Sequence, residues 1–387
     1  MRKLRVAVVG GGIGGVAAAN ALLQADVDVH VFEQAPALGE VGAGLAIQPN
    51  GARMLRRLRL GAELDRWGAR WLDPQFQHPD GTLIAPMWPV ERTPEIEMYG
   101  MHRADLLAML VRRLPAGVVH TDHRCVRFEQ DARQAMLSFA NGAQHDFDVV
   151  VGADGIHSTL QQYVTPPSAP IAAGSVAYRG VVSAAKVDWP SGAMRNWLGP
   201  GKHFLVYPVR GGELVNYVGF VPTDVQTKES WSAPGDPARL AAAFSGWNPM
   251  IDAILAAVEQ TFWWGLYDRE PLPRWTAGRL TLLGDAAHPM LPHVGQGANQ
   301  AIEDSVALAT LLGTTDAAAA PDALQAYERL RREHTARVQL SARRNGARYD
   351  SQTGDLRDRD QQLSNQAQER AWIWSYDAQA AAAALRS

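Results

Sequence analysis

The feature that most constrains the fold is a glycine-rich segment directly after the first apolar run. Residues 4–9 (LRVAVV) predict a short buried parallel strand, and residues 13–25 predict a helix rich in small side chains. Between them lies a GxGxxG pattern that starts at Gly10. Gly10 permits a tight turn, Gly12 lets a pyrophosphate approach the backbone, and Gly15 lets the helix pack on the sheet. The positive end of the helix dipole would then face the phosphates.

An acidic residue completes this pattern. Residues 28–33 predict a second strand, and Glu33 ends it about 20 residues after the glycines, where a carboxylate can bond a ribose hydroxyl. Strand, helix and acid together predict a dinucleotide site. The pattern alone does not separate FAD from NAD, and a tight glycine turn without a ligand is the alternative.

Two further glycine-centred motifs follow buried strands. Residues 147–151 lead into Gly152-Ala153-Asp154-Gly155, and residues 280–283 lead into Gly284-Asp285. An aspartate at the carboxyl end of a strand can bond ribityl or ribose hydroxyls in the crevice of an α/β sheet. Residues 295–299 (GQGAN) then open a predicted helix, so their N–H groups can face an electron-rich ring edge.

Composition excludes several classes of protein. A chain of 387 residues with 47% hydrophobic residues has ample material for a large core and is too apolar to be disordered. A net charge of −3 argues against a nucleic acid or an anionic membrane as a partner. The single cysteine, Cys125, excludes an internal disulfide framework or a Cys-rich metal site, and we expect no metal. No apolar run suits a signal peptide or a membrane span, so we expect a soluble cytoplasmic protein.

The order of the three motifs resembles the single-component FAD-dependent aromatic hydroxylases, the group A flavoprotein monooxygenases. The resemblance extends from residue 5 to about residue 376. It is closest to the branch of salicylate hydroxylase, 3-hydroxybenzoate 6-hydroxylase and 6-hydroxynicotinate 3-monooxygenase. The segments that carry this finer similarity are residues 43–50 (AGLAIQPN), 101–106 (MHRADL), 177–180 (AYRG), 288–293 (HPMLPH) and 374–377 (WSYD).

The resemblance implies an α/β architecture: a Rossmann-like FAD-binding domain with an inserted β-sheet substrate domain and C-terminal helices. We expect the FAD-binding domain in residues 1–170, with a β-rich insertion at about 71–100. Residues 171–275 would form the strand-rich substrate domain, and residues 276–387 would return to the FAD-binding domain and add the helices. Within that last part we expect an arginine-rich helix with a solvated arginine face, and a weakly helical end at residues 378–384.

The resemblance also implies which residues hold FAD. The expected contacts comprise the pyrophosphate loop, the adenosine ribose, the ribityl chain and the flavin ring. The residues are Gly10, Gly12, Gly14, Gly15, Glu33, Gln34, Arg103, Asp154, Gly155, Gly284, Asp285, Pro292, Gly297, Ala298 and Asn299.

Three positions depart from the family pattern. Gln34 and Gln161 stand where the family often has arginine, and the second of these weakens any inference about nicotinamide binding. Ala46 stands where the hydroxynicotinate branch carries histidine, which argues against that exact activity.

A hairpin in the predicted second domain offers candidate catalytic groups. Residues 204–221 predict two strands joined by a Gly-Gly turn. Because side chains alternate along a strand, His203 and Tyr207 share one face. The expected register places His203 opposite Phe220 and Tyr207 opposite Asn216. A His-x-x-x-Tyr pair is also typical of the 3-hydroxybenzoate and hydroxynicotinate branches.

The chemistry implied by the family gives these groups a use. A flavin C4a-hydroperoxide delivers an electrophilic oxygen, and a phenolate reacts with it better than a phenol does. A neutral His203 can take the phenolic proton, and Tyr207 can orient the substrate or relay that proton. His293 is a second candidate base. The alternative is that His203 and Tyr207 are ordinary buried residues of a sheet.

The sequence therefore predicts an FAD-dependent monooxygenase that uses NAD(P)H, with NADH favoured, and O2. Its small aromatic substrate would be a phenolic or hydroxy-N-heteroaromatic ring that we expect to be carboxylated, with Arg179 or Arg195 as its partner. A flavin oxidase, reductase or halogenase on the same fold and a non-catalytic FAD-binding protein are the alternatives. A homodimer through the C-terminal helices is left open.

Overall fold

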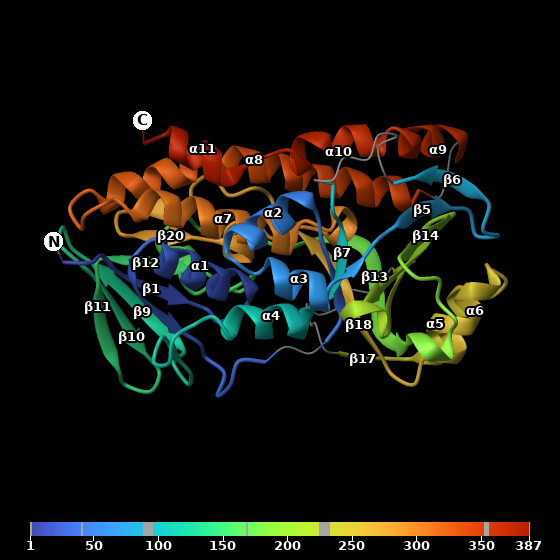
Figure 1. The fold of residues 1–387 in the computed structure, drawn as a ribbon, viewed down its shortest axis with the longest axis horizontal. Helices are drawn as coiled ribbons and strands as arrows, with labels where there is room; N and C mark the ends of the chain where they lie inside the picture. Colours follow the sequence, from blue (N-terminus) through green and yellow to red (C-terminus); the bar gives the residue numbers. More distant parts are fainter. Residues whose placement is uncertain are drawn as a thin grey trace.

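The computed structural model describes residues 2–39, 42–87, 96–167, 169–223, 233–351 and 356–386. Residues 88–95 of the predicted insertion therefore lie outside the described residues. The structure has the α/β class that the sequence predicts, with a parallel sheet at one end and a large antiparallel sheet at the other (Figure 1).

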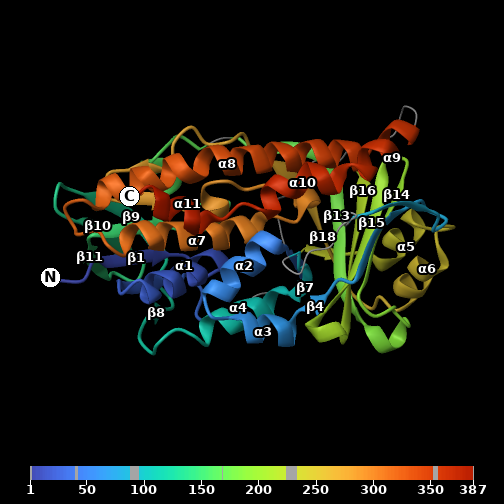
Figure 2. The ribbon, with the colours of Figure 1, turned by 45° about the horizontal axis from the view of Figure 1, so that its top comes forward.

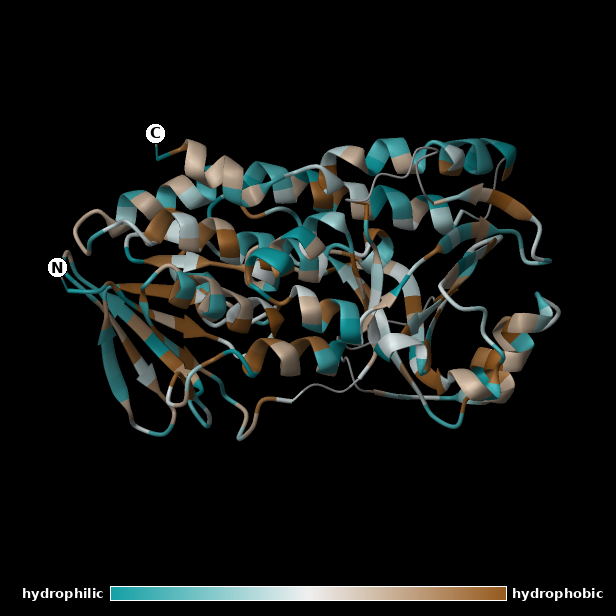
Figure 3. Ribbon diagram, viewed as in Figure 1, coloured by the Kyte–Doolittle hydropathy of each residue, from teal (hydrophilic) through white to brown (hydrophobic). Residues whose placement is uncertain are grey.

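The first sheet is six-stranded and parallel except at one edge, where β19 runs antiparallel to β20. Its central strand, β1, pairs on one side with β2 and on the other with β12. In spatial order the strands are β19 (Thr276–Ala277), β20 (Leu280–Leu282), β12 (Val149–Gly152), β1 (Arg5–Val9), β2 (Asp28–Phe32) and β8 (Val119–His120). Figure 3 shows the interior strands largely hydrophobic, as burial on both faces requires.

Layers on both faces bury this sheet. Helix α1 (Ile13–Gln24) packs against β1 and helix α7 (Gly297–Leu312) on one face. A three-stranded sheet covers the other face, where Phe139 lies against Phe32 of β2. That small sheet comprises β9 (Cys125–Gln130), β10 (Ala135–Phe139) and β11 (Gln144–Phe147).

The second large sheet has eight strands and is antiparallel except for the β14–β5 pair. The segment before helix α4 (Arg103–Val111) contributes the last two strands of this sheet, so the predicted insertion and the predicted second domain share one sheet. In spatial order the strands are β17 (Ala233–Gly235), β18 (Thr261–Asp268), β13 (Ile171–Ser183), β16 (Leu214–Pro222), β15 (Lys202–Val209), β14 (Ala193–Gly199), β5 (Asp73–Gln77) and β6 (Leu83–Pro86).

Between the two large sheets lies a second small sheet, formed by β3 (Gly44–Ile47), β7 (Tyr99–His102) and β4 (Ala69–Arg70). The helices near it are α2 (Pro49–Arg57), α3 (Gly61–Trp67) and α4 (Arg103–Val111). Two short helices, α5 (Pro237–Ala243) and α6 (Pro249–Ala256), cover one face of the eight-stranded sheet. They lie within residues 171–275, where the sequence pattern predicts strands and turns but no helix.

The C-terminal helices join the two ends of the molecule. Helix α8 runs beside both large sheets, as Figures 1 and 2 show. The helices are α7 (Gly297–Leu312), α8 (Ala320–Tyr349), α9 (Leu356–Ser364), α10 (Gln366–Trp374) and α11 (Ala378–Ala384). Helix α11 is more firmly held than the weakly helical end that the sequence predicts. Asp377 caps the helix and pairs with Arg57, and the side chains of Ala378 and Ala382 are buried. No helix of the described residues is long and apolar enough to cross a bilayer.

The expectation that the arginines of α8 are solvated is wrong for Arg331. Its side chain is fully buried, with Nη2 lying 2.8 Å from Glu303 Oε2 and Nε 2.8 Å from Asp304 Oδ1. The other oxygen of Asp304 lies 2.6 Å from His288 Nε2. Burial opposes the charge of Asp304, but His288 and Arg331 outweigh it and lower the pKa of Asp304 to about 2. The buried cation thus holds α8 on two acids of α7.

Removing that cation should destabilise the protein strongly. We expect Arg331→Ala to lower the free energy of unfolding by roughly 3–5 kcal/mol, because it leaves buried carboxylates without their counter-charge. Denaturant unfolding measures this. Arg329→Ala, at an exposed position of the same helix, is the matched control and should change stability by no more than about 0.5 kcal/mol. Equal effects of the two substitutions would contradict a structural role for the buried pair.

Candidate active site

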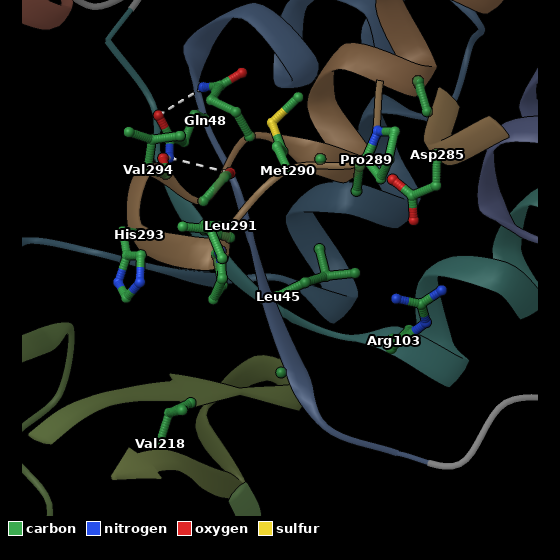
Figure 4. A pocket seen from close by; sticks show the side chains of 18 of the residues that line it. Leu45, Gln48, Arg103, Val218, Asp285, Pro289, Met290, Leu291, His293 and Val294 are labelled. Atoms are coloured by element: carbon green, nitrogen blue, oxygen red, sulfur yellow. Dashed lines mark hydrogen bonds between the residues drawn. The ribbon is translucent and has the colours of Figure 1, made fainter. Parts of the chain in front are cut away.

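One cavity of about 370 Å³ connects the glycine turns of the parallel sheet with the face of the eight-stranded sheet. The residues of the sequence-predicted site that line it come from both ends. They are Gly12, Gly14, Arg103, Gly155, His203, Tyr207, Gly284, Asp285, Pro292, His293, Gly297 and Ala298. Figure 4 shows part of this wall, with Arg103 and Asp285 at one end and His293 at the other.

The glycines of the first motif divide into two kinds. Gly10 has φ +112°, and a Cβ there would collide with the carbonyl oxygen of Ala153. A Cβ at Gly15 would collide with the Gly10 carbonyl oxygen. Gly12 is different, because no atom lies within 4 Å of the position of its Cβ. The first two glycines therefore allow close backbone packing, and Gly12 leaves open space at the start of α1.

The acid after β2 is engaged with the same loop. Glu33 accepts hydrogen bonds from the N–H groups of Gly11 (2.7 Å) and Ala35 (2.8 Å). It lies outside the lining of the cavity, as does the exposed Gln34. Each carboxylate oxygen has a further lone pair, so Glu33 can still accept a bond from a hydroxyl group.

The second motif offers an unsatisfied oxygen. Asp154 Oδ2 accepts hydrogen bonds from the N–H (2.7 Å) and hydroxyl (3.1 Å) of Thr159. Its Oδ1 is buried and has no hydrogen-bond partner among the described residues. Gly155, next to it, has φ +78° and faces open space in the cavity. Gly155 therefore lines the cavity, whereas Asp154 lies just outside its lining.

The third motif brings a carboxylate and a guanidinium into the cavity. Asp285 lies in the turn after β20, and Arg103 is the first residue of α4. Burial lowers the pKa of Arg103, and the charge of Asp285 opposes that effect. The two side chains approach each other across the cavity in Figure 4.

The loop before α7 is held by amide side chains. Asn299 donates hydrogen bonds to the carbonyls of Ala46 (2.9 Å) and Gly295 (2.8 Å) and accepts one from the N–H of Gln48 (2.9 Å). Asn299 is fully buried and lies outside the cavity lining, so its side chain positions the loop. Gly297 begins α7 and faces open space. A Cβ added there would lie 3.9 Å from Asp285 Oδ1.

On the opposite wall, the hairpin has the predicted register. His203 pairs with Phe220 and Tyr207 with Asn216. The turn differs from the prediction: Arg210 has φ +51° and leaves the ladder in a short helical turn. Its guanidinium lies 2.8 Å from Asp105 Oδ2, and this ion pair gives the turn a tertiary constraint that a hairpin rule does not contain.

His203 has a partner that the sequence analysis missed. Its Nδ1 lies 2.8 Å from Oδ1 of Asp350, the residue after α8, and its ring stacks on Phe220 with centroids 4.0 Å apart. The ring of His293 lies 5.5 Å from it. In the sequence, Asp350 is marked only by its place at the end of a long predicted helix. That place does not indicate a contact with His203, which is distant in the sequence.

The other two candidate groups have strongly shifted acidities. Burial raises the pKa of Tyr207 well above its ordinary value, so its hydroxyl stays protonated. Burial, together with the charge of nearby His203, lowers the pKa of His293 to about 3, so this ring stays neutral and is a weak base. His293 Nδ1 is buried without a hydrogen-bond partner among the described residues.

Of the two arginines considered for a carboxylate, one lines the cavity. Arg179 lies over the ring of Trp264, 4.4 Å from its centroid. Burial and the like charge of Arg103 lower the pKa of Arg179 to about 10, against a smaller opposing effect of Tyr207. Arg195 lies outside the lining and pairs with Asp73 at 2.7 Å.

These observations test whether FAD suits the site. Gly12, Gly155 and Gly297 each leave open space where an added Cβ would meet the cavity. Asp285 supplies an acceptor for hydroxyl groups in the lining, and the start of α1 supplies N–H groups for phosphates. The donor set fits a flavin dinucleotide.

Comparisons with known proteins agree with that fit. Residues 3–342 match the protein family described as "FAD binding domain". The chain is 38% identical to the 3-amino-4-hydroxybenzoate 2-monooxygenase PtmB3 of Streptomyces platensis, over 97% of this chain and 96% of that protein. It is 35% identical to a salicylate hydroxylase of Pseudomonas putida, over 97% of this chain and 93% of that protein.

Solved structures show the same relationship. A salicylate hydroxylase in complex with its substrate superposes with a TM-score of 0.84 at 30% identity, covering 98% of this chain and 97% of that one. Klebsiella pneumoniae HpxO complexed with FAD and uric acid gives a TM-score of 0.84 at 27% identity, covering 98% of this chain and 97% of that one. The chain thus belongs to the FAD-binding family of the aromatic-ring monooxygenases, as the three glycine-centred motifs predict.

Proposed function

We propose that this FAD-dependent monooxygenase hydroxylates a phenolic ring that carries a carboxylate, with NADH as the reductant and O2 as the source of oxygen. The observation that carries the proposal is the shared cavity: the glycine turns and Asp285 line one end, and His203, Tyr207 and apolar side chains line the other. Ala46 also lines this cavity, where the hydroxynicotinate branch has histidine, which favours a phenol over a hydroxypyridine.

FAD would be held by groups from all three motifs. When bound, FAD accepts a hydride from the reduced nicotinamide and activates O2 for transfer to the ring. Gly12 and the start of α1 would donate N–H hydrogen bonds to the pyrophosphate. Glu33 would accept a hydrogen bond from the adenosine ribose, and Asp285 would accept one from the ribityl chain. Gly297 and Ala298 would present backbone N–H groups to the flavin ring.

His203 would act as the base on the substrate. Removing the phenolic proton sends electron density to the ortho and para carbons of the ring, where an electrophilic oxygen attacks. Tyr207 stays protonated and can donate a hydrogen bond that orients the substrate. His293, with its pKa lowered to about 3, would contact the substrate as a neutral ring without taking its proton.

Arg179 would bind the carboxylate of the substrate. Its charge is buried in the wall of the cavity, where an anion stabilises it. Trp264, beneath the guanidinium, fixes its plane through a cation–π contact. This arrangement supports a hydroxybenzoate-like acid, the class named in several of the similar enzymes.

Asp285 tests the cofactor site. We expect Asp285→Ala to reduce FAD content at least tenfold, because the carboxylate would bond the ribityl hydroxyls and balance Arg103. The ratio of flavin to protein absorbance in the purified protein measures the content. Asp358→Ala, at an exposed position on α9, should keep full flavin content. A fully yellow Asp285→Ala protein would show that the assignment is wrong.

His203 tests the proposed base. We expect His203→Ala to retain FAD and to slow hydroxylation of the best substrate by roughly 10²- to 10⁴-fold, the usual contribution of a positioned base. Product formation by chromatography, with flavin content as the control, measures both effects. Unchanged turnover would show that His203 is not the base.

A further inference from the structure

The imidazole of His203 is held from behind by two residues from elements distant in the sequence. His203 Nδ1 lies 2.8 Å from Asp350 Oδ1, and Asp350 Oδ2 accepts a hydrogen bond of 2.8 Å from the hydroxyl of Ser175. Only 2% of the His203 side chain and 18% of the Asp350 side chain is exposed. The three residues come from β15, the end of α8 and β13, so the contact exists only in the folded chain.

The position of Asp350 is itself fixed on both sides. The carbonyl of Ser351 accepts a hydrogen bond from the N–H of Gly201 (3.0 Å), which ties the end of α8 to the turn before β15. Tyr349 packs its ring on Phe76, with centroids 5.8 Å apart, and its hydroxyl bonds Gln366 on α10. The carboxylate is therefore held in place before any ligand enters the cavity.

The charge of Asp350 determines which nitrogen of His203 carries the proton. Burial raises the pKa of Asp350, but the charge of His203 and its hydrogen bond outweigh burial and hold that pKa below its ordinary value. An ionised carboxylate only accepts hydrogen bonds, so Nδ1 must be the protonated nitrogen. Nε2 is then left with a lone pair. No side chain of the described residues bonds it, and the ring lines the cavity.

We propose that Asp350, oriented by Ser175, is the positioning residue that makes His203 Nε2 the proton acceptor of the substrate site. The inference rests on the role proposed above for His203. When Nε2 takes the proton of the substrate hydroxyl, the O–H bond breaks, an N–H bond forms, and the oxygen keeps the electron pair. The imidazolium then lies beside the carboxylate at the C-terminal, negative end of the α8 dipole, and both stabilise it.

The other groups around His203 do not replace this effect. Phe220 on β16 is apolar, and His293 on the loop before α7 stays neutral, with its pKa lowered to about 3. Arg370 on α10 bonds the hydroxyl of Tyr349 (2.9 Å), and as a cation it disfavours the imidazolium. Asp350 is thus the negative group that the described residues place beside the ring.

A purely structural role is the competing explanation, because the same contact joins α8 to the sheet. Such a role predicts a loss of stability with an unchanged dependence of activity on pH. A positioning role predicts a changed pH dependence and a changed tautomer in a protein that still binds FAD and substrate.

The test compares Asp350→Asn with the wild-type holoenzyme. We expect kcat for the best phenolic acid to fall roughly 10- to 100-fold, with KM and FAD content within about twofold of wild type. Without the carboxylate the imidazolium loses its counter-charge, so the acid limb of the kcat profile should move to lower pH.

Three further variants keep the test decisive if Asp350→Asn folds poorly. Asp350→Glu retains the charge, so its acid limb should stay near that of wild type although its kcat falls. Ser175→Ala leaves the carboxylate less constrained and should lower kcat by a smaller factor than Asp350→Asn. Glu369→Gln removes a surface carboxylate that pairs with Arg348 and should change neither property.

A second readout is independent of turnover. ¹⁵N NMR of histidine-labelled holoenzyme, with the His203→Ala protein used to assign the signal, should show Nδ1–H in wild type and a mixed or Nε2–H tautomer in Asp350→Asn. An unchanged tautomer and an unchanged acid limb in Asp350→Asn, with His203→Ala still impaired, would overturn the inference. If His203→Ala is itself unimpaired, the proposed base is wrong instead.

Discussion

The close contact between the Gly10 turn and the backbone of Ala153 is the constraint on which the site depends. A side chain at Gly10 would collide with the Ala153 carbonyl, so the ends of β1 and β12 can lie together only because the position is glycine. Because these strands pair in parallel, the first and second motifs both lie at the carboxyl ends of the strands. The β12–β20 pairing adds Asp285 at the same end of the sheet, and a single crevice results.

Buried polar contacts then connect this crevice to the second sheet. Arg331 holds α8 on Asp304 of α7, and α7 begins at Gly297 in the wall of the cavity. At its other end, α8 delivers Asp350 to His203. One long helix therefore fixes the distance between the proposed flavin end of the cavity and the proposed base.

The parts of the fold that sequence reasoning reached are those with local signals. The glycine motifs and the register of the His203 hairpin depend on residues close together in the chain, and the structure has both. Helices α5 and α6 also begin with a local signal, an N-cap residue followed by proline. These pairs are Asp236-Pro237 and Asn248-Pro249.

The remaining features depend on pairs distant in the sequence. Nothing in the pattern of α8 separates the buried Arg331 from its solvated neighbours, because its partners lie on another helix. Asp350 likewise gains its meaning only from a histidine on β15. The resemblance implies that the backbone of Asn299 contacts the flavin ring, and it does not indicate that the side chain holds the loop through Ala46 and Gln48.

The most direct test of the proposed activity is an aerobic screen of NADH oxidation over phenolic and hydroxypyridine carboxylic acids, with peroxide and ring-hydroxylated product measured together. The account predicts that a hydroxybenzoate-like acid stimulates NADH oxidation and that hydroxylated product accounts for most of the NADH consumed. Oxidation that no acid stimulates, or that yields peroxide alone, would contradict it.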